Sequence, residues 1–546
     1  MKTQKFLIIT LSLLMLSFGL VGSGWSQTNK NGKKDPKNNQ KKAQKKADTD
    51  EEEEPLEIIN ADSLKGRTVK GGDEFRILKH NVVIRHKGNT LYCDSAVQNI
   101  TKNTVRALGN ARMLGSDGTR VTSTTMFYDG NKKVANASGN VVLVDEKGTL
   151  TTESLDYDVV SQVAHYYTGA KIVDSENILT SKEGTYDTNS KIAFFTTDVH
   201  LTSKKDKQEI FSDNIQYNMV SKMAYFKGKT KIVSKDGTVY ANEGEYNTKT
   251  KISNFRTKGD ARPKAETEEY ILLGDSLYYD NTNRIGFAKG NARLISKKDS
   301  IIIDGDIGRF WGKEGISKVY GSALMKNISE GDTLYLAADT LISIRKKKEN
   351  SEDSVKILKA FHNTKIFRTE LQGKCDSLIY NFSDSSIYMY NDPVLWDDKS
   401  QLSGDSIRVQ MANNKIHTMH LRTNSFVIQE DTLGNYNQMK GRNMDAFFKQ
   451  NELKRVDVRG NGESIFFAVE GDSILTGMNR VICSDIDIRF GAKNKVKTVT
   501  FKAKPDGKFI PPHELADPDK RLKGFLWRIN DRPKKIDLLR QRDKKL

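Results

Sequence analysis

A unit of about thirty residues repeats along this chain and constrains its fold more than any other feature of the sequence. The clearest copies align on tyrosines that are 29, 29, 31, 29 and 33 residues apart: Tyr128, Tyr157, Tyr186, Tyr217, Tyr246 and Tyr279. Each tyrosine is followed six positions later by an apolar residue: Val134, Val163, Ile192, Met223, Ile252 and Ile285. A near-constant period with a fixed internal offset is typical of repeat proteins, in which each unit packs on its neighbours.

Each unit consists of short strand-like segments joined by tight turns. Alternating stretches of Val, Ile, Tyr, Phe and Thr are separated by turns such as Asp117-Gly118, Lys147-Gly148 and Asp236-Gly237. Weaker copies, such as Asp405-Ser406-Ile407, extend the array over residues 57–503. The expected fold class is all-β: an elongated, repeat-built, solenoid-like stack of antiparallel strands with a short C-terminal cap.

A column of small residues stands two positions before the start of the Ser-Leu-x-Tyr-Asp segment or its equivalent. Its members are Cys93, Ser123, Thr152, Ser181, Ser212, Ala241, Gly274, Ala338, Cys375 and Gly404. We interpret the column as a crowded corner where successive turns of the chain stack. Cys93, Cys375 and Cys483 are then expected to be free and buried, like small hydrophobic residues, and a metal or redox site is the alternative.

The second strand of each unit has one face that combines small and aromatic residues, as in Ala193/Phe195 and Ala224/Phe226. The other face includes Asn136 and His165, which would need hydrogen-bond partners in a dry interior. The small-and-aromatic face is therefore predicted to point inward. Candidate lipid-contacting interior residues are Leu155, Tyr166, Phe195, Ile215, Phe226, Phe255 and Leu277. The same face is compatible with a lipid-sized groove and with a tightly packed core.

The sequence offers no catalytic or metal-binding constellation, so we predict a non-enzyme without cofactor or metal. Carboxylates recur at one place in the repeat, as at Asp94, Asp213 and Asp275, which is typical of turn and strand-start residues. His417 and His420 fall on opposite faces of a strand-like segment. The chain contains no phosphate-binding loop, zinc-ligand spacing or nucleophile elbow.

The two ends of the chain differ from the array. Two lysines and an apolar run over residues 6–21 predict a secretory signal peptide, with an uncleaved anchor helix as the alternative. The segment after residue 503 is basic and is expected to cover the last strand edge; a docking or membrane-surface role is the alternative. The predicted organisation is: 1–26 signal peptide, 27–56 disordered Lys/Asn/Glu-rich tether, 57–345 clear repeats, 346–503 degenerate repeats, and 504–546 basic C-terminal cap or tail.

The formal net charge of +18 favours an anionic partner. Export makes nucleic acid the least suitable one, so we expect no nucleic-acid partner. A membrane surface or a phosphorylated lipid remains, and a charged surface that keeps copies of the protein apart is the alternative.

The repeat also resembles a known family. Its order is Ser-Leu-x-Tyr-Asp, a lysine-flanked turn, an apolar-Ala strand and then Gly-Asn before a β-run. The best copies are residues 128–144 with Gly139-Asn140, residues 154–173, and residues 276–295 with Gly290-Asn291. This pattern resembles the OstA-like family of periplasmic lipopolysaccharide-transport bridge proteins.

The resemblance implies a β-jelly roll whose hydrophobic interior carries acyl chains and whose copies or partner domains stack end to end through strand edges. It implies a non-catalytic carrier of lipopolysaccharide, or of a related anionic glycolipid, in the periplasm of a Gram-negative bacterium or at its outer membrane, peripheral to the membrane. The rival hypotheses are an exported β-repeat scaffold or adhesin with a dry core, and a β-solenoid polysaccharide-degrading enzyme. The enzyme would need acids unique to one unit, which the repeat does not offer.

Overall fold

The computed structural model describes residues 55–543 except 70–71, 236, 269, 298–299, 330–331, 348–353, 398, 413–414, 450–451, 471–472 and 492–495. The predicted signal peptide, and all of the predicted tether except its last two residues, lie outside the described residues. Among the described residues, no helix is long and apolar enough to cross a membrane.

The described chain divides into two units. The N-terminal unit comprises residues 55–235 with 247–249, and the C-terminal unit comprises 237–246 with 250–543. The boundary lies about a hundred residues before the one predicted at 345/346, which was placed where the repeat becomes degenerate. The predicted change from clear to degenerate repeats at residue 345 stays a prediction.

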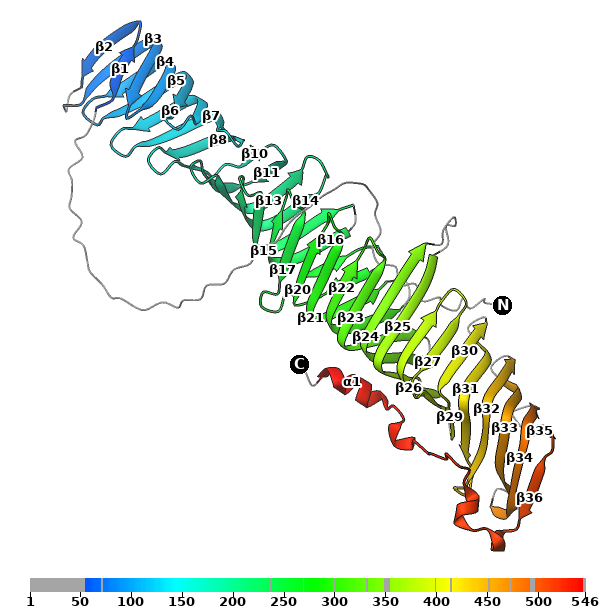
Figure 1. Cartoon of the computed structure of the whole chain (residues 1–546). Coiled ribbons are helices and arrows are strands. Elements are labelled where there is room, and N and C mark those ends of the chain that lie inside the picture. The colour runs from blue at the N-terminus through cyan, green and yellow to red at the C-terminus, as the bar shows by residue number, and fades with distance from the viewer. Residues whose placement is uncertain are drawn as a thin grey trace, which may run out of the picture. The chain divides into compact units, whose positions relative to one another are not determined.

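The N-terminal unit consists of antiparallel strands, and from β3 to β8 and from β13 to β15 each strand pairs with the next one in sequence (Figure 1). They are β1 Glu57–Asn60, β2 Ser63–Thr68, β3 Glu74–His86, β4 Asn89–Asn99, β5 Thr104–Leu114, β6 Arg120–Asp129, β7 Val134–Val144, β8 Thr149–Asp158, β9 Val163–Tyr166, β10 Ala170–Val173, β11 Asn177–Ser181, β12 Glu183–Asp187, β13 Ile192–Ser203, β14 Glu209–Asn218 and β15 Met223–Ser234.

The C-terminal unit continues the same pattern and ends in short helices. Its strands are β16 Gly237–Asn247, β17 Ile252–Arg256, β18 Lys264–Glu266, β19 Tyr270–Leu273, β20 Ser276–Asp280, β21 Ile285–Ser296, β22 Ile301–Trp311, β23 Ile316–Ser329, β24 Asp332–Lys347, β25 Ser354–Phe367, β26 Leu371–Asn381, β27 Ser386–Tyr390, β28 Val394–Asp397, β29 Ser400–Ser403, β30 Ser406–Ala412, β31 Lys415–Glu430, β32 Tyr436–Lys449, β33 Glu452–Glu470, β34 Ile474–Phe490, β35 Val496–Lys502 and β36 Asp506–Ile510. They are followed by η2 Pro512–Glu514, η3 Asp517–Lys520, η4 Ile529–Asp531 and α1 Lys535–Asp543. The all-β prediction is confirmed, although the strands extend to residue 510 and not only to 503.

The long strands bend at a two-residue bulge. On β7 the pairing register shifts between Ser138 and Val141, and the intervening Gly139 and Asn140 have φ angles of 80° and 48°. Strands that bend in this way pass from one sheet layer to another. We call the strand halves that carry the aligned tyrosines the first layer. The halves that end in turns such as Asp145–Gly148 form the second layer.

The recurrent carboxylates hold these bulges in place. The side-chain amide of Asn110, in the bulge of β5, donates to Asp94 of β4 at 2.8 Å, and that of Asn424 of β31 donates to Asp405, which directly precedes β30, at 3.1 Å. Asp213 accepts from the backbone amide of Lys229 at 2.8 Å. These acids were predicted as turn or strand-start residues that bond nearby backbone amides; instead each of the three accepts from a residue of the neighbouring strand.

The small-residue column lies at the same bend. Cys93, Cys375 and Cys483 are all free and buried, as predicted.

The bulge glycines supply one stability prediction. A Cβ on Gly139 would lie 2.7 Å from the Thr124 hydroxyl oxygen, and its φ of 80° disfavours any side chain. Gly139→Ala is therefore expected to lower the free energy of unfolding by about 1–3 kcal/mol in urea titrations. Gly66→Ala is the matched control, because a Cβ on Gly66 would have no heavy atom within 4 Å. Equal effects of the two substitutions would contradict the role given to the bulge.

The segment after β36 forms a strap, defined here as residues 511–543. On β31 the bend lies between Arg422 and Ser425, so Phe426 and Ile428 point away from the interior. They are nevertheless only 6% and 1% exposed, because they pack in one cluster with Leu522, Phe525 and Trp527 of the strap. Figure 1 shows the strap, in red, running back from β36 past β29 and β26.

Two buried glutamines fix the strap to the second layer. The side-chain amide of Gln438 donates to the Lys520 carbonyl at 2.8 Å and accepts from the Leu522 amide at 2.8 Å. Gln401 makes the same pair of bonds with the Leu526 carbonyl, at 2.8 Å, and the Arg528 amide, at 2.7 Å. The C-terminal segment was predicted to cover the last strand edge; instead β36 pairs with β34, and the strap covers the outer face of the second layer. The last strand layer, β35 with β36, pairs with β34.

Candidate functional site

The candidate site is the interior between the two layers, and the predicted residues lie in it. One row of paired residues crosses adjacent strands from Tyr166 through Gly184, Phe195 and Ile215 to Phe226. Leu155, Tyr166, Phe195, Ile215 and Phe226 belong to the N-terminal unit and are at most 1% exposed. Phe255 and Leu277 pair with each other in the C-terminal unit and are 3% and 6% exposed.

The opposite faces of the same strands point outward. Phe194 and Tyr225, which are sequence neighbours of Phe195 and Phe226, are 48% and 37% exposed. The side chains of the small-and-aromatic face are therefore buried.

Polar contacts connect the two layers of the N-terminal unit. Asp174, in a second-layer turn, accepts from the Tyr217 hydroxyl and from the Lys222 ammonium, both at 2.8 Å. The Asp174 side chain has no exposed surface, and that of Lys222 is 13% exposed. Asn177 donates to the same tyrosine oxygen at 2.9 Å. Tyr217 and Lys222 are thus tied to a turn of the second layer, the tyrosine by a hydrogen bond and the lysine by a buried ion pair.

The preceding repeats make related contacts. Asp145 accepts from the Tyr186 hydroxyl and, at 3.0 Å, from Lys191. Tyr128 is hydrogen-bonded to His86 at 2.8 Å. We call the contacts of Tyr128, Tyr186 and Tyr217 with His86, Asp145, Lys191, Asp174 and Lys222 the polar seam. It closes the N-terminal interior along the side opposite the bend.

Hydrogen bonding governs the ionisation of the seam. Burial opposes the charge on Asp174, but hydrogen bonds from Lys222, from the amides of Glu176 and Asn177 and from Tyr217 outweigh it, so its pKa lies below the usual value of 3.8. The pKa of Asp145 is lowered in the same way, with burial opposed by Tyr186 and Lys191. Burial, followed by the nearby Asp174 charge, raises the pKa of Tyr217.

These shifts predict that acid weakens the N-terminal unit. Because the folded-state pKa values of Asp145 and Asp174 lie below the unfolded value of 3.8, the two carboxylates stabilise the fold above about pH 4. That stabilisation is lost as the pH falls through the folded-state values. Urea titrations at pH 7 and pH 3 are expected to show a larger loss of stability for the wild type than for Asp145→Asn/Asp174→Asn. An equal loss in both proteins would contradict the assignment.

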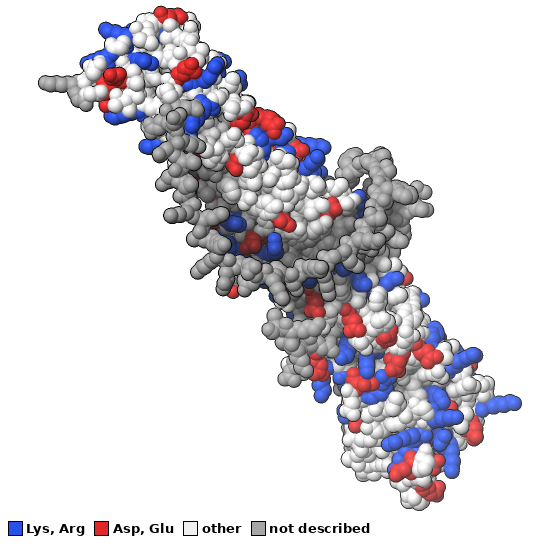
Figure 2. Space-filling model, turned by 60° about the vertical axis from the view of Figure 1, so that its left-hand side comes forward, with Lys and Arg blue, Asp and Glu red and all other residues white. Residues whose placement is uncertain are grey.

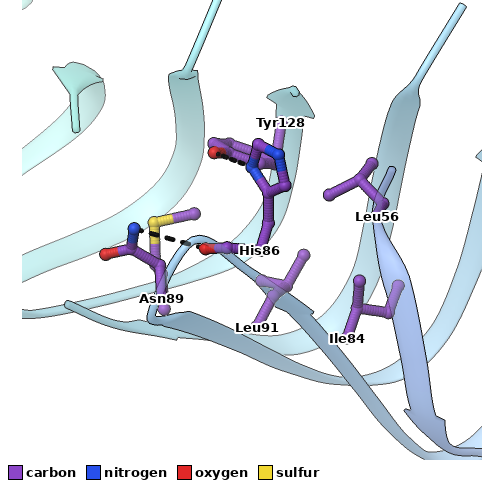
Figure 3. A pocket seen from close by; sticks show the side chains of 7 residues that line it. Leu56, Ile84, His86, Asn89, Leu91 and Tyr128 are labelled. Atoms are coloured by element: carbon purple, nitrogen blue, oxygen red, sulfur yellow. Dashed lines mark hydrogen bonds between the residues drawn. The ribbon is translucent and has the colours of Figure 1, made fainter. Parts of the chain in front are cut away.

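One pocket of the N-terminal interior contains little free space. Figure 3 shows this pocket, which is lined by residues that include Leu56, Ile84 and Leu91 and in which the Tyr128 hydroxyl meets the His86 ring. Its water-accessible volume is about 10 Å³, which is room for about one water molecule. This part of the interior is packed.

The C-terminal interior is apolar along much of its margin. Three residues after the bend, where the N-terminal unit places a tyrosine, several first-layer strands of the C-terminal unit carry an apolar residue: Phe310, Val409, Ala446 and Ile488. Tyr246, Tyr279 and Tyr380 keep a tyrosine at that place. These strands share one large hydrophobic cluster, which extends from Tyr270 to Ile488. Fifteen hydrophobic residues that are only partly buried pack against it: Leu272, Ile366, Leu371, Tyr380, Phe382, Ile387, Leu402, Met411, Ile416, Val427, Met439, Phe448, Leu453, Phe490 and Phe501.

Sequence reasoning missed both the polar seam and the C-terminal lining. The two aspartates of the seam do recur in the sequence, since Asp145 and Asp174 are 29 residues apart and stand at one place in the repeat. Within the described residues, no group of three or more His, Cys, Asp or Glu side chains could hold a metal ion. Figure 2 shows Lys and Arg interspersed with Asp and Glu over the visible face.

Comparisons with known proteins found two family models that match parts of the chain, and similar solved structures. A family model described as OstA-like protein matches residues 53–209 and 204–270, and one described as LptA/(LptD N-terminal domain) LPS transport protein matches residues 328–415. Among solved structures, the chain is similar to LptH, the LptA homologous periplasmic component of the lipopolysaccharide transport device from Pseudomonas aeruginosa. The identity is 17%, the match covers 27% of this chain and 92% of that chain, and the TM-score is 0.15. No curated protein matches the chain.

Proposed function

Because the chain belongs to the OstA-like family of lipopolysaccharide-transport proteins, we propose that it is a non-catalytic periplasmic carrier of lipopolysaccharide or a related anionic glycolipid. The acyl chains lie in the apolar interior of the jelly roll while the lipid passes toward the outer membrane. The observation that carries this proposal is the apolar lining of the C-terminal interior, which both layers supply. Burial of acyl chains against such a lining is favoured by the hydrophobic effect.

The charge of the chain supports the same class of ligand. Lipopolysaccharide carries phosphate groups, and a formal net charge of +18 attracts anions to the protein surface. The polar part of the lipid would remain in water beside the interior, where basic and acidic side chains share the surface (Figure 2).

The unpaired strand edges are sites where partner proteins can bind. Among the described strands, β1 and β2 both pair with β3, and β35 and β36 both pair with β34, so one edge of each outermost layer is unpaired. An unpaired edge accepts a strand from another chain. We propose that other jelly-roll proteins of the transport system join this chain end to end through these edges.

A second candidate function is an exported β-repeat scaffold with a dry core. The packed interior and polar seam of the N-terminal unit favour it, because they leave space for about one water molecule in the pocket of Figure 3. A scaffold would retain no lipid.

Lipid retention separates the two functions. The full chain, purified from a lipopolysaccharide-producing bacterium in a detergent that does not strip bound lipid, is analysed by native mass spectrometry. The transport function predicts lipopolysaccharide bound in a defined ratio. A chain that carries no lipopolysaccharide, and takes none up on incubation with it, would support the scaffold and overturn the carrier.

A further inference from the structure

We propose that the acyl-chain site lies in the C-terminal unit alone, and that the polar seam keeps the N-terminal interior shut to lipid. This inference rests on the proposed function and deepens it by locating the site. It also assigns different tasks to two units that share one repeat.

The N-terminal unit is closed by contacts that are costly to break. An acyl chain that enters between the layers there must separate Asp174 from Lys222 and Tyr217, and Asp145 from Lys191. Both carboxylates lie in side chains that are at most 2% exposed. Separating a buried ion pair leaves charges without compensation in an apolar surrounding. The aromatic row behind the seam, which includes Phe195 and Phe226, is 1% exposed.

The C-terminal unit has apolar residues along much of its margin. Tyr246 and Tyr279 of this unit keep the aligned tyrosine, but farther along the chain Val409, Ala446 and Ile488 stand at that place and form part of the buried cluster. Partly buried side chains extend the lining outward in both layers, for example Phe448 in the first layer and Met439 in the second. An acyl chain that enters here breaks none of the ion pairs that define the seam.

Methionines make this lining adaptable. Met325, Met389, Met419 and Met444 are buried in the cluster, and Met411 and Met439 pack against it. Unbranched thioether side chains fill irregular spaces and repack readily. Such a lining suits a ligand with several flexible acyl chains.

The test places one photoreactive residue, p-azidophenylalanine, at four phenylalanines of the full chain, so that each substitution is nearly isosteric. Phe448 and Phe226 probe the two interiors; Phe447 and Phe194 are the outward-facing controls, since Phe447 lies 4.7 Å beneath the Arg455 guanidinium and Phe194 is 48% exposed. After incubation with lipopolysaccharide, strong crosslinking is expected at Phe448 and background levels at the other three positions. Circular dichroism confirms that each variant is folded.

The outcomes distinguish the inference from the function on which it rests. Equal crosslinking at Phe226 and Phe448 would overturn the confinement but leave the carrier function standing. No crosslinking at any interior position, in a chain that also retains no lipid, would overturn both.

A second arm tests the seam as a barrier. In Asp174→Asn/Tyr217→Phe, which keeps the side-chain shapes, crosslinking from Phe226 is expected to rise above background. A folded variant without that rise would overturn the barrier role.

Discussion

Deletion of residues 511–546 is expected to make the chain insoluble, or to lower the stability of its C-terminal unit sharply. The strap packs in one cluster with outer-face side chains that include Phe426, Ile465 and Met478, which are at most 6% exposed. Losing the burial of three such side chains costs about 5–9 kcal/mol, which is comparable with the whole stability of many domains. An apolar stripe uncovered in this way also promotes association. Size-exclusion chromatography and urea titration measure the two effects.

A matched pair of leucines in the strap provides the finer test. Leu522 is 2% exposed within the outer-face cluster, whereas Leu526 is 62% exposed. Leu522→Ala is expected to reduce the free energy of unfolding by about 2–5 kcal/mol, and Leu526→Ala by less than about 0.5 kcal/mol. A soluble deletion variant of unchanged stability, or equal effects of the two leucines, would show that the strap does not cover this face in solution.

The second large effect is expected at the polar seam. Lys222→Met leaves the buried Asp174 charge without its cation while keeping the length of the side chain, and should lower the stability of the N-terminal unit by about 3 kcal/mol. Lys182→Met is the control, because its ion pair with Asp198 joins side chains that are 69% and 68% exposed. Such a pair contributes about 0–1 kcal/mol.

A double-mutant cycle makes the assignment specific. If Asp174 and Lys222 stabilise each other, then Lys222→Met/Asp174→Asn should be less destabilised than the sum of the two single variants. Urea titrations of the four proteins give the coupling energy. Additive effects would contradict a direct interaction between the two side chains.

The fold could be predicted from the sequence wherever the repeat is regular. The period and the alternation within each strand suffice to bury Ala193 with Phe195 and to expose Phe194, because strand side chains alternate strictly between faces. The corner was predictable for a similar reason, since every copy needs a small residue there.

The polar seam could not be predicted because it joins the two layers across repeats. Tyr186 meets Asp145, 41 residues earlier, and Tyr217 meets Asp174, 43 residues earlier, so neither separation equals the period. Which turn faces which tyrosine depends on how far the layers are displaced, and that displacement leaves no pattern along the chain.

The C-terminal lining and the strap could not be predicted from the sequence, for other reasons. Farther along the C-terminal unit the lining loses the aligned tyrosine, as at Val409 and Ala446, so the alignment that nominated interior residues as far as Leu277 did not extend there. The strap has no periodicity, and its anchors Gln401 and Gln438 lie more than eighty residues before the backbone groups they bind. An outward-facing phenylalanine on a strand, such as Phe426, is expected to be exposed unless another segment of the chain covers it.

The most direct test of the carrier account is the response of the C-terminal interior to lipid. A nitroxide spin label is attached at Met411→Cys, on the partly buried lining, and at Lys449→Cys, on the exposed end of β32, in a chain whose three free cysteines are replaced by alanine. Titration with lipopolysaccharide is expected to slow the motion of the label at position 411 and to shield it from a water-soluble relaxation agent, with no change at position 449. An unchanged label at position 411 in the presence of excess lipopolysaccharide would contradict the account.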